Sequence, residues 1–167
     1  TAPTTPTAPA STVPEPPIVS RADWGADEKL SPDPSEYNAD VKAVFVHHTA
    51  GSNDYTCAES ASIVRAVYAY HTTPTPNGNG WNDLGYNFLV DKCGTIFEGR
   101  KGGVDLPVLG AHTYGWNRES AGIAVLGNYT DAGASNAALT SVARIAAWKL
   151  GQYGADPDST VQLKAGA

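Results

Sequence analysis

The chain of 167 residues carries 17 acidic and 11 basic side chains, which gives a net charge of −6 at pH 7. An acidic surface excludes nucleic-acid binding through a basic face and argues against electrostatic adhesion to anionic lipid. Hydrophobic residues make up 41% of the chain and charged residues 17%, with no apolar run near the roughly 18 residues that a membrane span needs. These figures indicate one globular domain that neither binds nucleic acid nor inserts into a membrane.

The first 19 residues differ in composition from the rest. Residues 1–17 hold six of the twelve prolines and five threonines, and Glu15 is their one charged side chain. Such a stretch buries too little apolar surface to fold. We therefore expect residues 1–19 to form an extended tether left after removal of a secretion signal, and residues 20–167 to form the folded domain. The alternative origin is an expression remnant.

A strand over residues 43–48 is predicted by its apolar run, and it ends in the pair His47 and His48. Neighbouring side chains on a strand face opposite ways, so both rings cannot point at one ion. Neutral histidine is a common metal ligand, so one interpretation of the pair is a metal site. The alternative is a structural role, in which one imidazole ring caps the end of the strand and the other lies in solvent, and it stays open at this point.

A helix over residues 57–71 follows. Thr56 and Glu59 have the spacing of a capping box at its start, and His71 falls at its end, where the helix dipole favours a cation. Helical spacing places four apolar residues on the face expected to pack on the sheet: Ile63, Ala66, Val67 and Tyr70.

The remaining elements alternate strands and one helix. We expect strands over residues 84–90, 95–98 and 121–126, with a tight turn over 91–94. Ser135 can cap a helix over 136–151. Its expected inward residues are Leu139, Val142, Ala146 and Leu150. This order predicts an α/β single domain with a mixed central β-sheet flanked by helices.

The chain has two cysteines, Cys57 and Cys93. An even number in an exported protein predicts a disulfide, which would tie the first helix to the hairpin turn. Metal binding is the rival reading, but the two sulfurs lack the close spacing of a thiolate zinc site.

Several motifs occur together in a fixed order. They are Ser20–Gly25, Val46–Gly51, Tyr70–His71, Gly80–Leu89, Gly94–Arg100, Gly110–His112 and Gly122–Asn128. In this order the set resembles the peptidoglycan recognition protein domain, also called the type 2 N-acetylmuramoyl-L-alanine amidase domain. The resemblance covers roughly residues 20–153 and implies that fold.

The resemblance implies a secreted, cell-wall-associated zinc hydrolase. It would cut the amide between the lactyl group of N-acetylmuramic acid and the first L-alanine of the stem peptide. His47 matches the first zinc ligand of the family, and Tyr86 matches its active-site tyrosine. A bound zinc ion would activate water and polarise the amide carbonyl, while the phenol of Tyr86 would assist. From the residues alone, Tyr86 is equally an ordinary half-buried strand tyrosine.

Further positions match those that contact the muramyl-peptide in related domains. They are His48, His71, His112, Tyr114 and Asn117. Ordinary structural roles remain open for each, such as a helix-end cation for His71 and a loop cap for His112. Trp81 and Trp116 flank this set and are equally read as packing anchors or as sugar platforms.

Two departures from the family pattern bear on catalysis. The family takes its other two zinc ligands from a downstream histidine and a downstream cysteine or aspartate, whereas no histidine follows His112 and no cysteine follows Cys93. Catalytic zinc normally has three protein ligands, so we expect the remaining ligands beyond Ala167 and a domain lacking its C-terminal part. Ala124 stands where some related bacterial amidases carry a glutamate as general base.

Three functions follow as hypotheses. The first is a zinc-dependent amidase with His47 as one ligand. The second is a non-catalytic module that binds peptidoglycan through the same residues without a metal. The third is an interaction or inhibitor protein that reuses the fold, because fold alone does not fix function.

Overall fold

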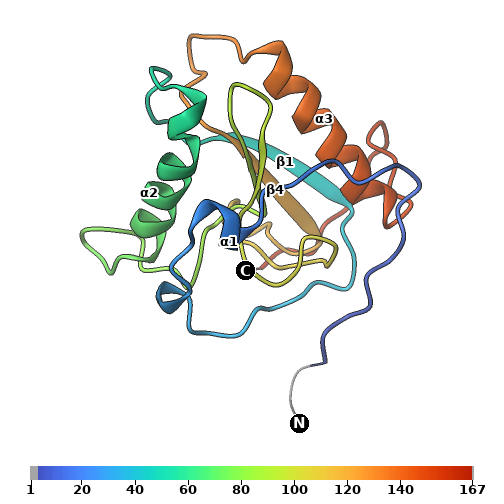
Figure 1. Cartoon of the computed structure of the whole chain (residues 1–167). Coiled ribbons are helices and arrows are strands. Elements are labelled where there is room, and N and C mark those ends of the chain that lie inside the picture. Colours follow the sequence, from blue (N-terminus) through green and yellow to red (C-terminus); the bar gives the residue numbers. More distant parts are fainter. Residues whose placement is uncertain (1–3, 167) are drawn as a thin grey trace.

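The computed structural model describes residues 4–166, so residues 1–3 of the expected tether and the final Ala167 lie outside it. In chain order the elements are α1 (Arg21–Trp24), the 3-10 turn η1 (Glu28–Leu30), β1 (Ala43–His48), η2 (Cys57–Glu59), α2 (Ser60–Thr72), β2 (Phe88–Val90), β3 (Ile96–Glu98), β4 (Ser120–Val125) and α3 (Asn136–Gly151). Figure 1 shows the chain coloured along its sequence, with the helices α1, α2 and α3 and the strands β1 and β4 labelled. No helix within residues 4–166 combines the length and the apolar character that a membrane span requires.

The strands form one mixed sheet in the order β1-β4-β2-β3. β4 runs parallel to both of its neighbours, and β3 pairs antiparallel with β2. The predicted α/β class with a mixed sheet is confirmed. The strand predicted over 84–90 is shorter than expected, because regular pairing begins only at Phe88 and leaves Tyr86 in an irregular segment before β2.

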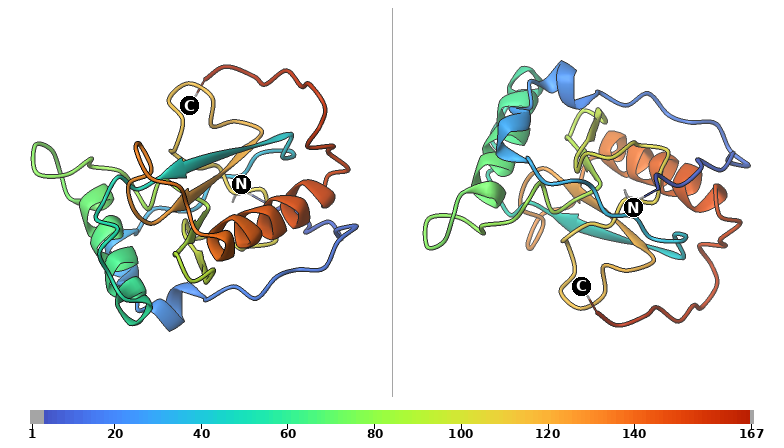
Figure 2. Two further views of the ribbon diagram at one scale, coloured as in Figure 1. Left: turned by 90° about the horizontal axis from the view of Figure 1, so that it is seen from above. Right: turned by 90° about the horizontal axis from the view of Figure 1, so that it is seen from below.

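The sheet lies between α3 and the pair α1 and α2, as Figures 1 and 2 show. Alternate residues of the strands face the two layers. Phe88 and Val90 join a core with Ile145 of α3, while Leu89 joins a second core with Val64 of α2. Each face of the sheet therefore packs against an apolar core.

The buried face of α2 matches the predicted face in part, since Ile63 and Val67 pack against the core but Ala66 and Tyr70 do not. Val64 and Tyr68 are buried, whereas Tyr70 is 58% exposed and Ala66 is exposed. Tyr68 packs edge-on against Trp24, and its hydroxyl is hydrogen-bonded to Ser31. Contact with a distant segment therefore selects the face of this helix.

The third helix follows its prediction in part. Ser135 accepts a hydrogen bond from the backbone of Ala138, which confirms the predicted cap. Val142 and Leu150 are buried as expected, but Leu139 is 53% exposed. Ala138, Ile145 and Trp148, which were not among the expected inward residues, lie in the core with Val142.

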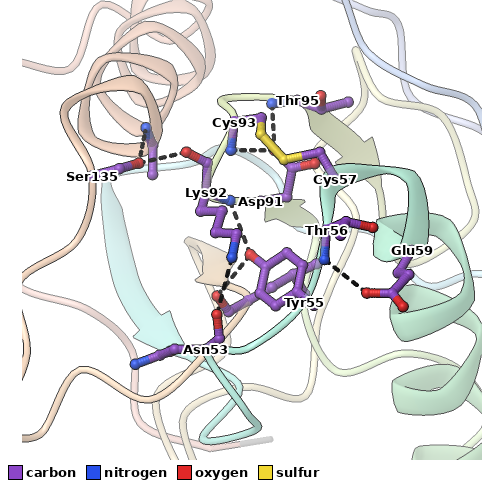
Figure 3. Close-up of a disulfide and its surroundings, with 12 residues drawn as sticks. Asn53, Tyr55, Thr56, Cys57, Glu59, Asp91, Lys92, Cys93, Thr95 and Ser135 are labelled. Atoms are coloured by element: carbon purple, nitrogen blue, oxygen red, sulfur yellow. Dashed lines mark hydrogen bonds between the residues drawn. A yellow bond between two sulfur atoms is a disulfide. The ribbon is translucent and has the colours of Figure 1, made fainter.

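The turn between β2 and β3 is joined to η2, directly before α2, by the Cys57–Cys93 disulfide (Figure 3), which confirms the predicted pairing. The carboxylate of Asp91 shapes the turn by accepting hydrogen bonds from the backbone of Cys93 and Thr95. The predicted capping box is also present, with Glu59 accepting from the backbone of Thr56. Covalent and polar contacts thus fix this end of the molecule.

The N-terminal segment lies along α3 and the sheet edge. The Ser11 hydroxyl donates to the carbonyl of Trp148 at 2.8 Å, and Gln152 donates to the carbonyl of Pro9 at 3.0 Å. Val19 pairs with Phe97 of β3 in a parallel bridge. The division into a tether and a domain at residue 19 stays a prediction, but residues 9–19 have defined contacts with the fold.

Candidate functional site

His47 lies near the carboxyl end of β1 and is half-buried. Its Nε2 atom is 3.2 Å from Nδ1 of His112 and 3.3 Å from the hydroxyl oxygen of Thr113. The latter two atoms are 2.9 Å apart. Two ring nitrogens and one hydroxyl therefore meet at one point above the sheet.

Gly122 of β4 makes room for the His112 ring. A Cβ atom added at Gly122 would lie 2.4 Å from Cγ of His112, closer than any real contact. Because Gly122 pairs with Phe45 of β1, the ring rests on the sheet two residues before His47 along that strand. The absence of a side chain at residue 122 thus brings His112 to His47.

The loop that carries His112 is closed by Asn117. The side-chain oxygen of Asn117 accepts hydrogen bonds from the backbone of His112 at 2.7 Å and of Thr113 at 2.8 Å. Tyr114 stands at the tip of this loop and is fully exposed. Gly166 donates a backbone hydrogen bond to Gly115, so the last described residues return to the same loop.

Tyr86 lies between His47 and His71. Its ring centroid is 5.6 Å from that of each histidine. Burial raises the pKa of the Tyr86 phenol, so this group keeps its proton at neutral pH. It can therefore donate a hydrogen bond to an oxygen that gains negative charge.

His71 is buried at the end of α2 and is held in one tautomer. Its Nδ1 atom accepts a hydrogen bond from the backbone of Gly85 at 3.0 Å. Burial, with a smaller contribution from the charge of Arg100, lowers the pKa of His71 to about 4. The neutral ring must then carry its proton on Nε2, which makes that nitrogen a donor. The expected helix-end cation is therefore wrong at neutral pH.

His47 and His112 are also uncharged at neutral pH. Burial is the main cause in both, and it lowers the pKa of His112 to about 3. Ala124 stands opposite His47 on β4, so β4 places no carboxylate beside this ring. The site is thus a neutral set of imidazoles, a phenol and a hydroxyl.

His48 points away from this cluster. Its Nδ1 atom accepts a hydrogen bond from the backbone of Tyr129 at 2.9 Å, and the two rings pack at 6.4 Å. Strand alternation separates it from His47, as predicted. A ligand-binding role for His48 stays a prediction, and it would belong to a different face of the sheet.

The structure brings together four of the predicted residues, His47, His71, Tyr86 and His112, with Asn117 supporting the loop. Three participants were not predicted, namely Thr113, Gly122 and Arg100. Each lies inside or beside a motif used for the resemblance, which is the signal that could have drawn attention to them. Trp81 also contacts the cluster, with its ring 4.7 Å from that of His71.

The donor chemistry at His47 suits zinc, which takes neutral imidazole nitrogen as a ligand. Within residues 4–166, one group of three metal-capable side chains lies close enough to hold an ion, namely Cys57, Asp91 and Cys93. The two sulfurs of that group are bonded to each other, so they offer no thiolate. His47 therefore fits the role of one zinc ligand, and the described residues leave the rest of the shell unassigned.

Comparison with protein families adds an independent finding. The profile of the N-acetylmuramoyl-L-alanine amidase family matches residues 37–165. This range includes the four clustered residues and the disulfide.

The chain is also similar to individual proteins. It is 37% identical to peptidoglycan-recognition protein SC2 of Drosophila melanogaster over 124 residues, which cover 74% of this chain and 62% of that protein. Among solved structures, Drosophila peptidoglycan recognition protein SA matches with a TM-score of 0.69 and 31% identity, over 82% of this chain and 75% of that one. Peptidoglycan recognition protein LE, solved in complex with tracheal cytotoxin, matches with a TM-score of 0.67 and 32% identity, over 77% and 70%. The chain thus spans less than two thirds of the length of the SC2 relative.

Proposed function

Because the chain belongs to the N-acetylmuramoyl-L-alanine amidase family, we propose that it is a zinc-dependent peptidoglycan amidase. The substrate would be the muramyl-peptide, and the bond cut would be the amide between the lactyl group and the first L-alanine. The observation that carries the proposal is the meeting of His47, His112 and Tyr86 around one face of β1.

An amide resists hydrolysis because resonance makes its carbonyl a poor electrophile. A zinc ion held by His47 would supply a bound water with a pKa of about 7 and would polarise the carbonyl. The other residues have roles that follow from their protonation. Tyr86 keeps its proton and can donate to the developing oxyanion, and the Nε2–H group of His71 is a second donor for a substrate oxygen.

The peptide and sugar parts of the ligand need recognition groups around this centre. Tyr114 is exposed on the loop that Asn117 closes, and Trp81 is 38% exposed beside His71. Aromatic rings stack on sugar and peptide faces, and the loop backbone is fixed by Asn117. We assign Tyr114 and His71 to ligand contact and Asn117 to the shape of the loop.

The protein is proposed to act outside the cell. The Cys57–Cys93 disulfide supports an oxidising compartment. The composition of the first 17 residues supports an exported chain.

Recognition without cleavage is the second candidate function. Ala124 offers no general base where some bacterial amidases have a glutamate, and the LE relative was solved with a bound peptidoglycan monomer. The two candidates share the same ligand and differ in whether a bond is cut.

Turnover of a muramyl-tripeptide by the wild type separates the two candidates, and a His47→Ala variant then tests the ligand assignment. We expect it to lose turnover by about 100-fold or more, because the metal loses a ligand, while the affinity for a muramyl-tripeptide changes by less than about 3-fold. Val46→Ala is the matched control, since Val46 is exposed on the same strand. Full turnover in the His47→Ala protein would contradict the ligand assignment.

A further inference from the structure

Arg100 is a half-buried arginine whose charge is stabilised by the carboxylates of Asp83 and Glu36 without a salt bridge to either among the described residues. The ion pairs among the described residues involve Arg21 and Lys42, and none involves Arg100. Its guanidinium instead donates to three backbone carbonyls, those of Leu84 at 2.7 Å, Leu109 at 3.0 Å and Asp83 at 3.5 Å. All three of these guanidinium hydrogen bonds therefore go to carbonyl oxygens, while the carboxylates of Asp83 and Glu36 act on the charge only through space.

The three carbonyls belong to two segments of the site. Residues 83–86 lead to Tyr86, and residues 109–112 lead to His112. The backbone of Arg100 also donates to the carbonyl of Tyr86 at 2.9 Å, and a backbone bond joins Ala111 to Gly85 at 2.9 Å. The guanidinium therefore spans the point where the two segments meet.

These two segments determine what surrounds His47. The ring centroid of Tyr86 is 5.6 Å from His47 and that of His112 is 5.2 Å from it. Gly85, which lies between the tied carbonyls and Tyr86, also fixes the tautomer of His71. A shift of one segment relative to the other would change all three ring contacts at once.

We propose that Arg100 is a positioning residue that ties the Tyr86 segment to the His112 segment and so sets the spacing of Tyr86 and His112 about His47. The inference rests on the proposed function for its effect on catalysis. Its structural part, the tie between two segments, can be measured separately. The planar, always charged guanidinium can bond several carbonyls in fixed directions, which the single ammonium of lysine cannot reproduce.

Two variants test the tie, Arg100→Met and the milder Arg100→Lys. Arg65→Lys is the matched control, because Arg65 also donates to a backbone carbonyl, that of Trp24 at 2.6 Å, but lies on α2 away from Tyr86 and His112. The first readout is hydrogen exchange at the amides of Gly85 and Ala111, which needs no activity. We expect exchange at both to rise by about 10-fold or more in either Arg100 variant and to stay unchanged in Arg65→Lys.

The second readout is kinetic. In the Arg100 variants kcat should fall by about 100-fold while KM stays within about 3-fold. A small displacement of Tyr86 and His112 relative to His47 affects the reaction geometry more than it affects substrate binding. Guanidinium ion added at low concentration should restore part of kcat in Arg100→Met, whereas kcat of Arg65→Lys should equal that of the wild type with and without it.

The outcomes separate the two proposals. If the wild-type protein cuts no peptidoglycan, the proposed function fails and the exchange data still decide the role of Arg100. Unchanged exchange at Gly85 and Ala111 in a folded Arg100→Lys protein would overturn the tie. If Arg100→Met fails to fold, Arg100→Lys carries both readouts. Normal kcat in that variant would overturn the effect on catalysis.

Discussion

At the scale of single residues, burial keeps the imidazole rings near His47 uncharged. The pKa of His71 is lowered to about 4 and that of His112 to about 3, in both cases mainly by loss of solvent. A neutral ring has a lone pair for a metal or an N–H group for a substrate oxygen, and a charged ring lacks the lone pair. The chemistry proposed for the site therefore depends on how these rings are buried.

This burial has a consequence for stability below pH 7. An unfolded His71 takes up a proton near pH 6.5, whereas the folded one does so only near pH 4. Between these values the unfolded state binds more protons, so the free energy of unfolding falls as the pH falls, by about 3 kcal/mol at most from this residue. Below about pH 4 both states are protonated at His71, so the decrease in the free energy of unfolding is complete and grows no further.

Urea unfolding of the wild type and of His71→Asn between pH 7 and pH 4 measures this effect. Asparagine keeps an oxygen able to accept from Gly85 but does not titrate. We expect the variant to lose less stability across the window. Parallel curves for the two proteins would show that His71 does not titrate as described.

The contact between Gly122 and His112 gives a second prediction. In Gly122→Ala the new methyl group must displace the His112 ring, since its carbon would lie 2.4 Å from Cγ. We expect the free energy of unfolding to fall by about 1–3 kcal/mol and the affinity for a muramyl-tripeptide to drop. Gly133→Ala is the control, because nothing lies within 4 Å of the carbon added there. Equal effects of the two substitutions would contradict the packing of His112 on Gly122.

The main residues around His47 could be predicted from the sequence, but their arrangement in space could not. The opposite directions of His47 and His48 follow from strand alternation, which is a local rule, and were predicted. The approach of His112 to His47 depends on a glycine on another strand and on Asn117 closing a loop. Such contacts between distant segments leave no mark in local spacing, so they could not be predicted.

At the scale of elements, the existence and type of the regular segments were easier to predict than their packing, although β2 is shorter than predicted. The strand over 43–48 and the cap at Ser135 are as expected. The packed face of α2 was predicted in part: Ile63 and Val67 pack against the core, but Val64 and Tyr68 form its buried centre and Tyr70 is exposed. Contacts of Tyr68 with Trp24 and Ser31 select the face that is buried. Tertiary contact thus decides between patterns that the sequence leaves equal.

The disulfide between the start of α2 and the hairpin turn stabilises the domain by linking residues 36 apart. On the chain-entropy model, a link of this length contributes about 4 kcal/mol. Replacing both cysteines by serine should lower the free energy of unfolding by about that amount, as measured by urea denaturation. The reduced wild type should show a similar loss. A variant as stable as the oxidised wild type would mean that polar contacts such as those of Asp91 hold the turn alone.

At the scale of the whole molecule, the proline-rich N-terminal segment packs against the domain over residues 9–19. Hydrogen bonds join Pro9, Ser11 and Thr12 to the end of α3. Val13 contacts the core around α3. The composition of this segment predicted a tether, because composition shows whether a segment can fold by itself. It does not show whether the segment can pack against the rest of the domain.

Deletion of residues 1–15 tests these contacts. Loss of the hydrogen bonds to the end of α3 should lower the free energy of unfolding by about 2 kcal/mol. Deletion of residues 1–8, which keeps Pro9 and Ser11, should have little effect. A free tether would make the two deletions indistinguishable in thermal unfolding.

The central claim is that a divalent metal beside His47 lets this domain cut peptidoglycan. The most direct measurement is the release of new L-alanine amino termini from purified cell walls by the protein expressed from its complete reading frame. We expect termini to form with zinc present, to stop forming when a chelator removes it, and to form again when zinc is restored. Binding to the walls that continues with the chelator, with no amino termini released under any condition, would contradict the amidase and leave a recognition domain.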